Sequence, residues 1–213
     1  MKEENTITIN MVENHIRTLN VIDDEVLNTL KVIPRKLFVP EKYKAFAHVD
    51  ISIPIGFNQK MLLPSVEAKI LQAMDIKKNE DVLLVGSGTG YLSTCVSMFA
   101  NRVHSIDIVE NFIEKSQENC KTLSNENISF EKLNILDNFK LIKSYKVIIF
   151  TVAVNNIDYI IDNIDNNSRC FIFENVTDFP IQKGMIVYKT NNSSCLKEYI
   201  LETNVEAITS GEQ

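Results

Sequence analysis

The sequence lacks tryptophan, has only four cysteines among 213 residues, and contains no apolar run long enough to cross a bilayer, which takes about 18 residues. The cysteines are far apart and form no C-x-x-C pair, so the sequence predicts neither a zinc site nor a dense disulfide framework. The opening residues Met1–Asn5 are acidic and show no apolar signal-peptide core. We therefore expect a cytoplasmic protein with no membrane association and no bound metal.

Positive charge is also scarce, because 22 lysines and arginines stand against 28 aspartates and glutamates, a net charge of -6. A surface that binds nucleic acid needs a large basic face, so we expect no nucleic-acid partner. The phosphate-binding pattern G-x-x-x-x-G-K-[ST] is absent. The hydrophobic share of 45% is ordinary for a globular protein, and the length suffices for one sizeable core with a small N-terminal addition.

From Asp81 onward, apolar strands alternate with helices, which indicates βαβ units and a mostly parallel sheet covered on both faces. The strands are expected at 81–85, 102–107, 128–134, 145–151 and 168–174, and the helices at 90–100, 110–123 and 156–164. The last two apolar segments, 182–190 and 194–202, are separated only by a turn at Asn191–Ser193, so they should form an antiparallel hairpin. The fold class is therefore α/β.

The N-terminal part reads differently from the alternating region. Residues 6–31 look helical, with Asp23 and Asp24 placed to cap a second helix, and residues 45–63 read as an ordered loop. Pro64 can begin the next helix as its first residue. We expect residues 1–64 to form helices and an active-site loop packed on a domain at 65–208, in a single compact unit. A frayed tail is expected at 208–213.

Three of the six glycines follow the first predicted strand, in the sequence Val85-Gly86-Ser87-Gly88-Thr89-Gly90-Tyr91. Glycine permits the positive φ values and the close backbone approach that a tight strand-to-helix turn needs. The dinucleotide fingerprint is G-x-G-x-x-G, whereas this turn reads G-x-G-x-G. That spacing is similar to the loop of S-adenosylmethionine-dependent methyltransferases.

Asp107 follows Gly86 by 21 residues and ends the apolar run Val103–Asp107. Its two carboxylate oxygens can accept hydrogen bonds from both hydroxyls of a ribose, which suits an acid at this strand end. The alternative is a helix N-cap or a solvated loop acid. Because Asp107 follows the three glycines at this spacing, we favour a role in cofactor binding.

The N-terminal half carries motifs of one family. Met11–Arg17 looks like the M-V-x-x-Q-I-R opening of protein-L-isoaspartate O-methyltransferases. Val32–Pro40 resembles their V-P-R-x-x-F-V-P, and Pro54–Gly56 resembles the P-I-G that opens their active-site loop. His15 stands in place of their glutamine and is interpreted as a helix-packing residue. Arg17 and Arg35 match family arginines and are interpreted as ion-pairing residues within the N-terminal helices.

The same family's motifs continue in the alternating region. Val85–Tyr91 is similar to its G-x-G-x-G-Y, Ser105–Asp107 to its S-I-E, and Tyr145–Val154 to its Y-D-x-I-x-x-T-A-A-A. The resemblance runs from residue 11 to about 155, and beyond 156 only the general layout persists. It implies a Rossmann-like methyltransferase fold and transfer of a methyl group from S-adenosylmethionine to the α-carboxylate of L-isoaspartyl residues in damaged proteins.

The resemblance also implies a set of cofactor contacts along the glycine turn and the following strand ends. Asn134 falls where the family has an acid near the adenine, and Asp137 is the alternative for that role. The residues expected to bind the cofactor are Val85, Gly86, Ser87, Gly88, Gly90, Tyr91, Asp107, Ile108, Asn134, Ile135 and Thr151.

The sequence departs from the family at two places. Leu84 stands two residues before the first glycine, where methyltransferases usually carry an acid that orders the loop and helps seat the cofactor's amino group. In the active-site loop, Lys60 and Leu62 replace the threonine and serine of a T-I-S motif, while Gln59 keeps an amide common in the family. Gln59, Lys60 and Leu62 are the substrate-loop candidates. Lys60 either binds an anionic substrate or is a solvated loop lysine, and Gln59 either acts or only packs the loop.

Three functions remain open from the sequence. The first is repair methylation of isoaspartyl proteins or peptides. The second keeps the cofactor but takes another acceptor, such as a small molecule, because the loop hydroxyls are lost. The third is a non-catalytic cofactor-binding relative, which Leu84 and the lost loop hydroxyls together suggest. The sequence leaves a monomer and a homodimer equally open.

Overall fold

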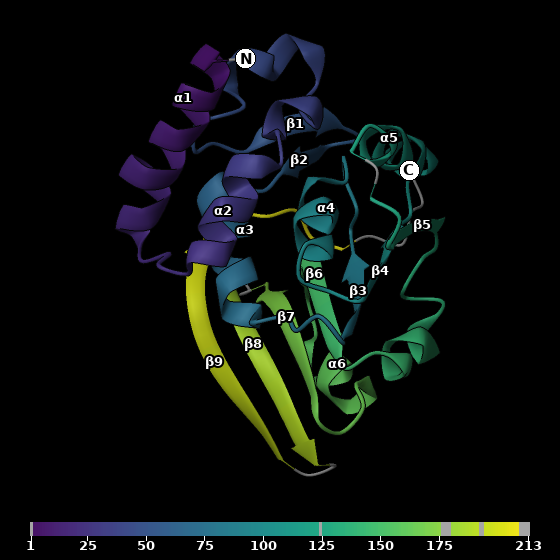
Figure 1. The fold of residues 1–213 in the computed structure, drawn as a ribbon. Coiled ribbons are helices and arrows are strands. Elements are labelled where there is room, and N and C mark those ends of the chain that lie inside the picture. The colour runs from purple at the N-terminus through teal and green to yellow at the C-terminus, as the bar shows by residue number, and fades with distance from the viewer. Residues whose placement is uncertain (1, 124, 176–179, 192–193, 209–213) are drawn as a thin grey trace.

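The computed structural model describes residues 2–123, 125–175, 180–191 and 194–208. These residues form a seven-stranded sheet in the order β5-β4-β3-β6-β7-β8-β9 (Figure 1). The strands are β3 (Asp81–Val85), β4 (Arg102–Asp107), β5 (Ile128–Lys132), β6 (Val147–Val154), β7 (Ser168–Glu174), β8 (Gln182–Asn191) and β9 (Ser194–Thr203).

Strands β3 to β7 are paired in parallel, whereas β8 pairs antiparallel with β7 and with β9. This arrangement confirms the predicted Rossmann-like sheet with a C-terminal antiparallel hairpin. Of the predicted turn, Asn192 and Ser193 lie outside the described residues.

Helices cover both faces of the sheet, as the strand–helix alternation predicts. Leu84 of β3 belongs to a buried cluster shared with α3 (Pro64–Met74) and α4 (Tyr91–Ser97), and α5 (Glu110–Lys121) lies against β4 and β5. Leu83 and Val85 belong to a second cluster, with α6 (Ile157–Asn163) and the 3-10 helix η5 (Phe139–Ser144). The division follows from strand geometry, because successive side chains point to opposite faces.

The predicted N-terminal helical region is broken into short elements. They are α1 (Lys2–Met11), the π-helical turn η1 (Val12–Ile16), the 3-10 helices η2 (Arg17–Leu19), η3 (Arg35–Leu37) and η4 (Glu41–Phe46), and α2 (Asp24–Val32). The predicted cap is confirmed, since Asp23 Oδ1 accepts hydrogen bonds from the backbone N–H groups of Glu25 and Val26, at 2.8 and 3.1 Å.

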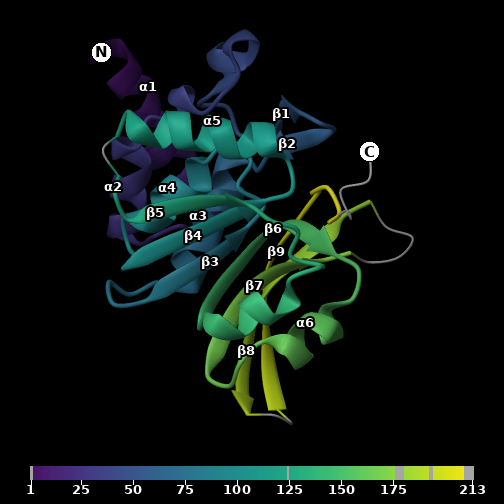
Figure 2. The same ribbon diagram turned by 90° about the vertical axis from the view of Figure 1, so that its right-hand side faces the viewer.

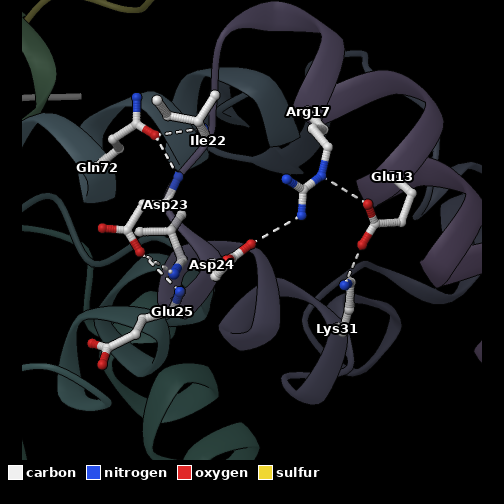
Figure 3. A network of polar contacts seen from close by, with 9 residues as sticks. Glu13, Arg17, Ile22, Asp23, Asp24, Glu25, Lys31 and Gln72 are labelled. Atoms are coloured by element: carbon white, nitrogen blue, oxygen red, sulfur yellow. Dashed lines mark hydrogen bonds and ion pairs between the residues drawn. The ribbon is translucent and has the colours of Figure 1, made fainter.

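Ion pairs hold these N-terminal elements together (Figure 3). Arg17 pairs with Glu13 at 2.8 Å and with Asp24 at 3.0 Å, while Lys31 of α2 also pairs with Glu13. The interpretation of Arg17 as an ion-pairing residue of the N-terminal helices is therefore confirmed. Gln72 of α3 accepts hydrogen bonds from the backbone N–H groups of residues 22 and 23, at 2.7 and 3.0 Å, which ties this region to the core.

The segment expected to be a loop contains a small hairpin. Strands β1 (Ile53–Gly56) and β2 (Gln59–Met61) pair antiparallel, and the turn residues Phe57 and Asn58 have φ values of 49° and 54°. Two successive positive φ values are typical of the tight turns that join hairpin strands. The loop expectation for 45–63 was wrong here because strands of three or four residues leave almost no period-2 signal in a sequence.

The N-terminal helices share a core with the sheet. One buried cluster includes Val12, Ile16 and Leu27 together with Val82 and Leu84 of β3. One continuous buried cluster thus spans residues 1–64 and 65–208. The division of the chain into these two parts remains a prediction.

The chain returns to the sheet after β9. The backbone N–H of Ala153 in β6 donates to the carbonyl of Glu206, and that of Ile208 donates to the carbonyl of Ala153, both at 2.8 Å. The expected frayed tail therefore does not include Ile208, and residues 209–213 lie outside the described part of the chain.

The four cysteines are free, with Cys95, Cys120 and Cys170 buried and Cys195 exposed. Among the described residues, no group of three or more His, Cys, Asp or Glu side chains is arranged to hold a metal ion. Within the same residues, no helix is both long and apolar enough to span a membrane.

Candidate active site

A cavity of about 310 Å³ lies at the carboxyl ends of β3 and β6. These two strands are neighbours in the sheet, and the chain runs outward from them in opposite directions, β4 and β5 on one side and β7 on the other. In open parallel sheets, ligands bind at this switch in strand order. The cavity therefore occupies the place where the fold itself favours a ligand.

The glycine turn forms one wall of the cavity. The backbone N–H groups of Gly86 and Ser87 donate to the carbonyl of Ile106 at 2.9 and 3.1 Å, so the turn is tied to the end of β4. Gly86 has a φ of 94°, and a Cβ there would meet Thr151 Oγ1 at 2.2 Å. Thr151 Oγ1 donates to the carbonyls of Val85 and Gly86, at 3.1 and 2.7 Å. Glycine is thus required at residue 86 for both conformation and space.

Asp107 is half-buried beside this turn. Its Oδ2 accepts from the Gly88 N–H at 3.0 Å and from Ser87 Oγ at 3.4 Å, and its Oδ1 accepts from the Val109 N–H at 3.0 Å. Burial raises the pKa of the Asp107 carboxyl, while these hydrogen bonds oppose the shift. Neither alternative reading fits, because the N-cap of α5 is Val109 and the carboxylate is not fully solvated.

The remaining predicted cofactor residues gather around the same cavity. All of them line it except Gly90, where a Cβ would instead meet Ser116 at 3.0 Å. Asn134 lines the cavity and its Nδ2 donates to Asp137 Oδ2 at 2.9 Å, whereas Asp137 does not line it. The structure brings these residues together, and their contact with a cofactor stays a prediction.

The β1–β2 hairpin forms the opposite wall, next to one end of α5 (Figure 2). Phe57 at its tip meets Phe112 of α5 edge to face, with ring centroids 5.4 Å apart. Gln59, Lys60 and Leu62 all line the cavity. Lys60 Nζ lies 3.2 Å from Glu206 Oε1, and both readings of this lysine stay predictions.

The family model for protein-L-isoaspartate(D-aspartate) O-methyltransferase matches residues 6–212 of the chain. The chain belongs to this family.

Curated relatives match part of this isoaspartate methyltransferase family chain. A protein-L-isoaspartate O-methyltransferase 1 of Archaeoglobus fulgidus is 32% identical over 110 residues, which are 50% of this chain and 51% of the relative. One of Syntrophobacter fumaroxidans is 32% identical over 118 residues, 55% of each chain. The chain thus spans about half the length of the curated relatives it matches.

Solved structures share the fold. A Plasmodium falciparum structure, described as a candidate protein-L-isoaspartate O-methyltransferase in complex with S-adenosyl-L-homocysteine, superposes with a TM-score of 0.79 at 20% identity. The match covers 95% of this chain and 98% of that one. A second structure, named protein-L-isoaspartate O-methyltransferase, gives a TM-score of 0.77 at 20% identity and covers 94% of this chain and 66% of that one.

Sequence reasoning missed one ionic group of this family member's cavity. Glu67 of α3 lines the cavity and forms a buried ion pair with Arg35, whose exposed side-chain fraction is 1% against 3% for Glu67. Arg35 Nη2 also donates to the carbonyl of Leu62 at 2.7 Å, and its guanidinium lies 4.7 Å from the ring centroid of Tyr91. Arg35 is thus paired to α3 and not within the N-terminal helices, which corrects the earlier interpretation.

Desolvation dominates the ionisation of Glu67. Burial raises its pKa to about 7, although the Arg35 guanidinium opposes that shift. The other charged or titratable groups that act on it or feel its charge are Asp50, which raises its pKa further, and the side chains of Tyr91 and Cys95. A sequence signal existed, because Glu67 shares the helical stripe of Ile70, Leu71 and Met74, all buried.

Leu84 lies close by in the sheet. Its side chain is fully buried, in the same cluster as Tyr91 and the apolar residues of α3. Leu84 does not line the cavity, whereas Glu67 of α3 does.

Proposed function

We propose that the protein transfers a methyl group from S-adenosylmethionine to the α-carboxylate of L-isoaspartyl residues in proteins or peptides. Membership of the isoaspartate methyltransferase family supports this activity. The observation that carries it is a single cavity that joins the glycine turn and Asp107 to Gln59 and Lys60 of the hairpin and to Leu62 just after it. Such a cavity lets the cofactor on the glycine turn meet the acceptor carboxylate at the hairpin.

The residues present fit the cofactor. A volume of about 310 Å³ is at the lower end of the range typical of small-molecule sites, about 300–1,000 Å³. A Cβ at Gly88 would meet only the end of the Ile55 side chain, at 3.4 Å, so the turn leaves its backbone open to a ligand. Asp107 offers acceptors for ribose hydroxyls, and Ile108 and Ile135 give apolar walls for an adenine.

When bound, the cofactor supplies a methyl group on a positively charged sulfur, which a carboxylate can attack in line. An α-carboxylate has a pKa of about 3.5, so it is ionised at neutral pH and needs no general base. The protein's part is to align the two groups and to keep water away, because opposite charges disappear in this step. Leu62 and Val85 give the cavity apolar walls suited to that task.

Lys60 is the group we assign to the acceptor carboxylate. Its side chain is 46% exposed and its partner Glu206 is 36% exposed, so their ion pair contributes little, about 0–1 kcal/mol. An incoming carboxylate can therefore replace Glu206 at small cost. The lysine acts as a point charge and lacks the directional bonding of the hydroxyls it replaces.

The test is transfer of tritium from labelled S-adenosylmethionine to an isoaspartyl peptide, scored as base-labile methyl ester. The matched control is the same peptide with a normal aspartyl linkage. We expect turnover on the first peptide and none on the second. Binding of S-adenosylhomocysteine without turnover on the isoaspartyl peptide would refute the repair function.

That outcome would favour the second candidate, a methyltransferase for a different acceptor such as a small molecule. The replacement of the hydroxyl positions by Lys60 and Leu62 is the observation that favours it. Restoring them in the variant Lys60→Thr/Leu62→Ser separates the two, because isoaspartyl turnover gained only in that variant assigns the difference to this loop. No binding of S-adenosylhomocysteine at all would leave the non-catalytic alternative. A cytoplasmic location and a monomeric or homodimeric state remain predictions.

A further inference from the structure

Two acids of the cavity, Asp107 and Glu67, come from different elements. Asp107 ends β4 and lines the cavity together with Ile108 and Asn134, where the nucleoside of the proposed cofactor fits. Glu67 of α3 lines it as well, and its partner Arg35 also bonds the Leu62 carbonyl and lies over the Tyr91 ring. The methionine part of the cofactor must extend from the ribose toward the acceptor loop, because the methyl group has to reach the acceptor there. Arg35 ties Glu67 to the carbonyl of Leu62 in that loop, which places Glu67 on the side where the amino-acid end of the proposed cofactor would lie.

Glu67 is short of partners for a buried carboxylate. Within the described part of the chain, Oε2 accepts from Arg35 and no donor contacts Oε1. An ionised carboxylate has about four acceptor sites, so most of its capacity is unused. Arg35 offers no help at this face, since its guanidinium is directed to Glu67, the Leu62 carbonyl and the Tyr91 ring.

The ligand that completes such a site is a cation with several N–H donors. An α-ammonium has three donors and a full positive charge, and charge-assisted hydrogen bonds are about twice as strong as neutral ones. Of the other acids of the cavity, Asp107 is assigned to the ribose and Glu206 is 36% exposed, so Glu67 is the buried acid of the three. Leu84, on the neighbouring strand, has no polar group to offer.

We propose that Glu67 binds the α-ammonium group of the cofactor through Oε1, while Arg35 holds the carboxylate in place through Oε2. The inference rests on the proposed use of S-adenosylmethionine. It makes Glu67 a cofactor-binding residue supplied by α3, outside the glycine turn and the strand ends that the sequence motifs indicate. Arg35 is a positioning residue, because it acts on the cofactor only through Glu67.

The experiment compares two ligands by titration calorimetry. S-adenosylhomocysteine carries the amino-acid end, and 5′-methylthioadenosine has the same nucleoside and thioether without it. For Glu67→Gln we expect S-adenosylhomocysteine to bind about 10- to 100-fold more weakly, as for a lost charge-assisted hydrogen bond, and methylthioadenosine to bind about as before. The matched control is Glu80→Gln, which also breaks a Glu–Arg pair, with Arg169 at 2.5 Å, but does not line the cavity.

A second variant tests the proposal in case Glu67→Gln does not fold. Glu67→Gln leaves Arg35 buried without its counter-charge, whereas Arg35→Met/Glu67→Leu removes both charges together, a change that is often well tolerated. Selective loss of S-adenosylhomocysteine in the double variant supports the proposal even if the single variant does not fold. Equal changes for both ligands in the double variant would overturn it. Failure of the unaltered protein to bind S-adenosylhomocysteine would instead overturn the proposed function.

Discussion

Glycine at residue 86 is explained by its backbone conformation and by lack of space for a side chain. Gly86→Ala, made alone and together with Thr151→Ala, should separate these two reasons. In Gly86→Ala an alanine would have to adopt a φ of 94°, and its new Cβ would lie 2.2 Å from Thr151 Oγ1. The backbone strain costs about 1–3 kcal/mol, and the overpacking costs a further amount of about 1–3 kcal/mol. We expect the free energy of unfolding to fall by the sum and the affinity for S-adenosylhomocysteine to fall with it.

The variant Thr151→Ala isolates the steric part. Without Oγ1, the nearest atoms to the new Cβ are Val152 Cγ1 at 3.5 Å and the Cβ of residue 151 at 3.6 Å, which are ordinary contacts. Thr151→Ala itself loses one hydroxyl hydrogen bond, shared between the carbonyls of Val85 and Gly86 and worth about 1 kcal/mol in total. Gly86→Ala should therefore cost about 1–3 kcal/mol less in the Thr151→Ala background than in the unaltered protein.

Urea unfolding followed by circular dichroism gives all four corners of this cycle. Gly88→Ala is the control, because its φ of 53° and its nearest atom at 3.4 Å, Ile55 Cδ1, predict backbone strain alone, about 1–2 kcal/mol. Additive costs for residues 86 and 151, within about 0.5 kcal/mol, would refute the steric argument. A Gly86→Ala variant as stable as the parent would refute the conformational argument as well.

Three further predictions concern the cavity. Asp107→Ala should weaken S-adenosylhomocysteine and methylthioadenosine alike, by about 10- to 100-fold, and a loss confined to the first would contradict its place at the nucleoside end. Lys60→Met should raise KM for an isoaspartyl peptide about threefold to tenfold with kcat retained, and steady-state kinetics showing a fall in kcat alone would contradict its binding role. Burial raises the pKa of Glu67 to about 7 in the fold, above the ordinary 4.5 that applies in the unfolded chain. Its contribution to ligand-free stability is therefore present below about 4.5 and lost as pH rises through about 7. Calorimetry should accordingly show S-adenosylhomocysteine binding more tightly at pH 8 than at pH 6, and a flat profile would count against an ionised Glu67 in the complex.

The central sheet could be predicted well from the sequence because its inner strands contain buried apolar runs, at 82–85, 147–150 and 170–173. The runs at 81–85, 102–107 and 168–174 coincide with β3, β4 and β7 residue for residue. The β1–β2 hairpin could not be predicted in this way. Pro54 and Gly56 are residues that are rare in strands, and the pairing with β2 depends on the tight turn between the two strands.

The residues of the site also fall into a part that the sequence predicts and a part that it does not. Residues of the glycine turn are adjacent in sequence, so their spacing alone brings them together in one wall. The Arg35–Glu67 pair joins residues 32 positions apart, and only tertiary packing decides that both side chains are buried. An acid in a helical stripe of Ile70, Leu71 and Met74 is a usable warning of such a pair, although it does not identify the partner.

The return of the chain after β9 bears on how the protein is made. Asn204 to Ile208 contribute a wall of the cavity and hydrogen-bond to Ala153 in β6, which neighbours the strand of the glycine turn. A nascent chain that has emerged only as far as β7 holds the glycine turn and Asp107 but not this wall. We therefore expect cofactor binding to become available only late in synthesis, once the C-terminal hairpin has joined the sheet.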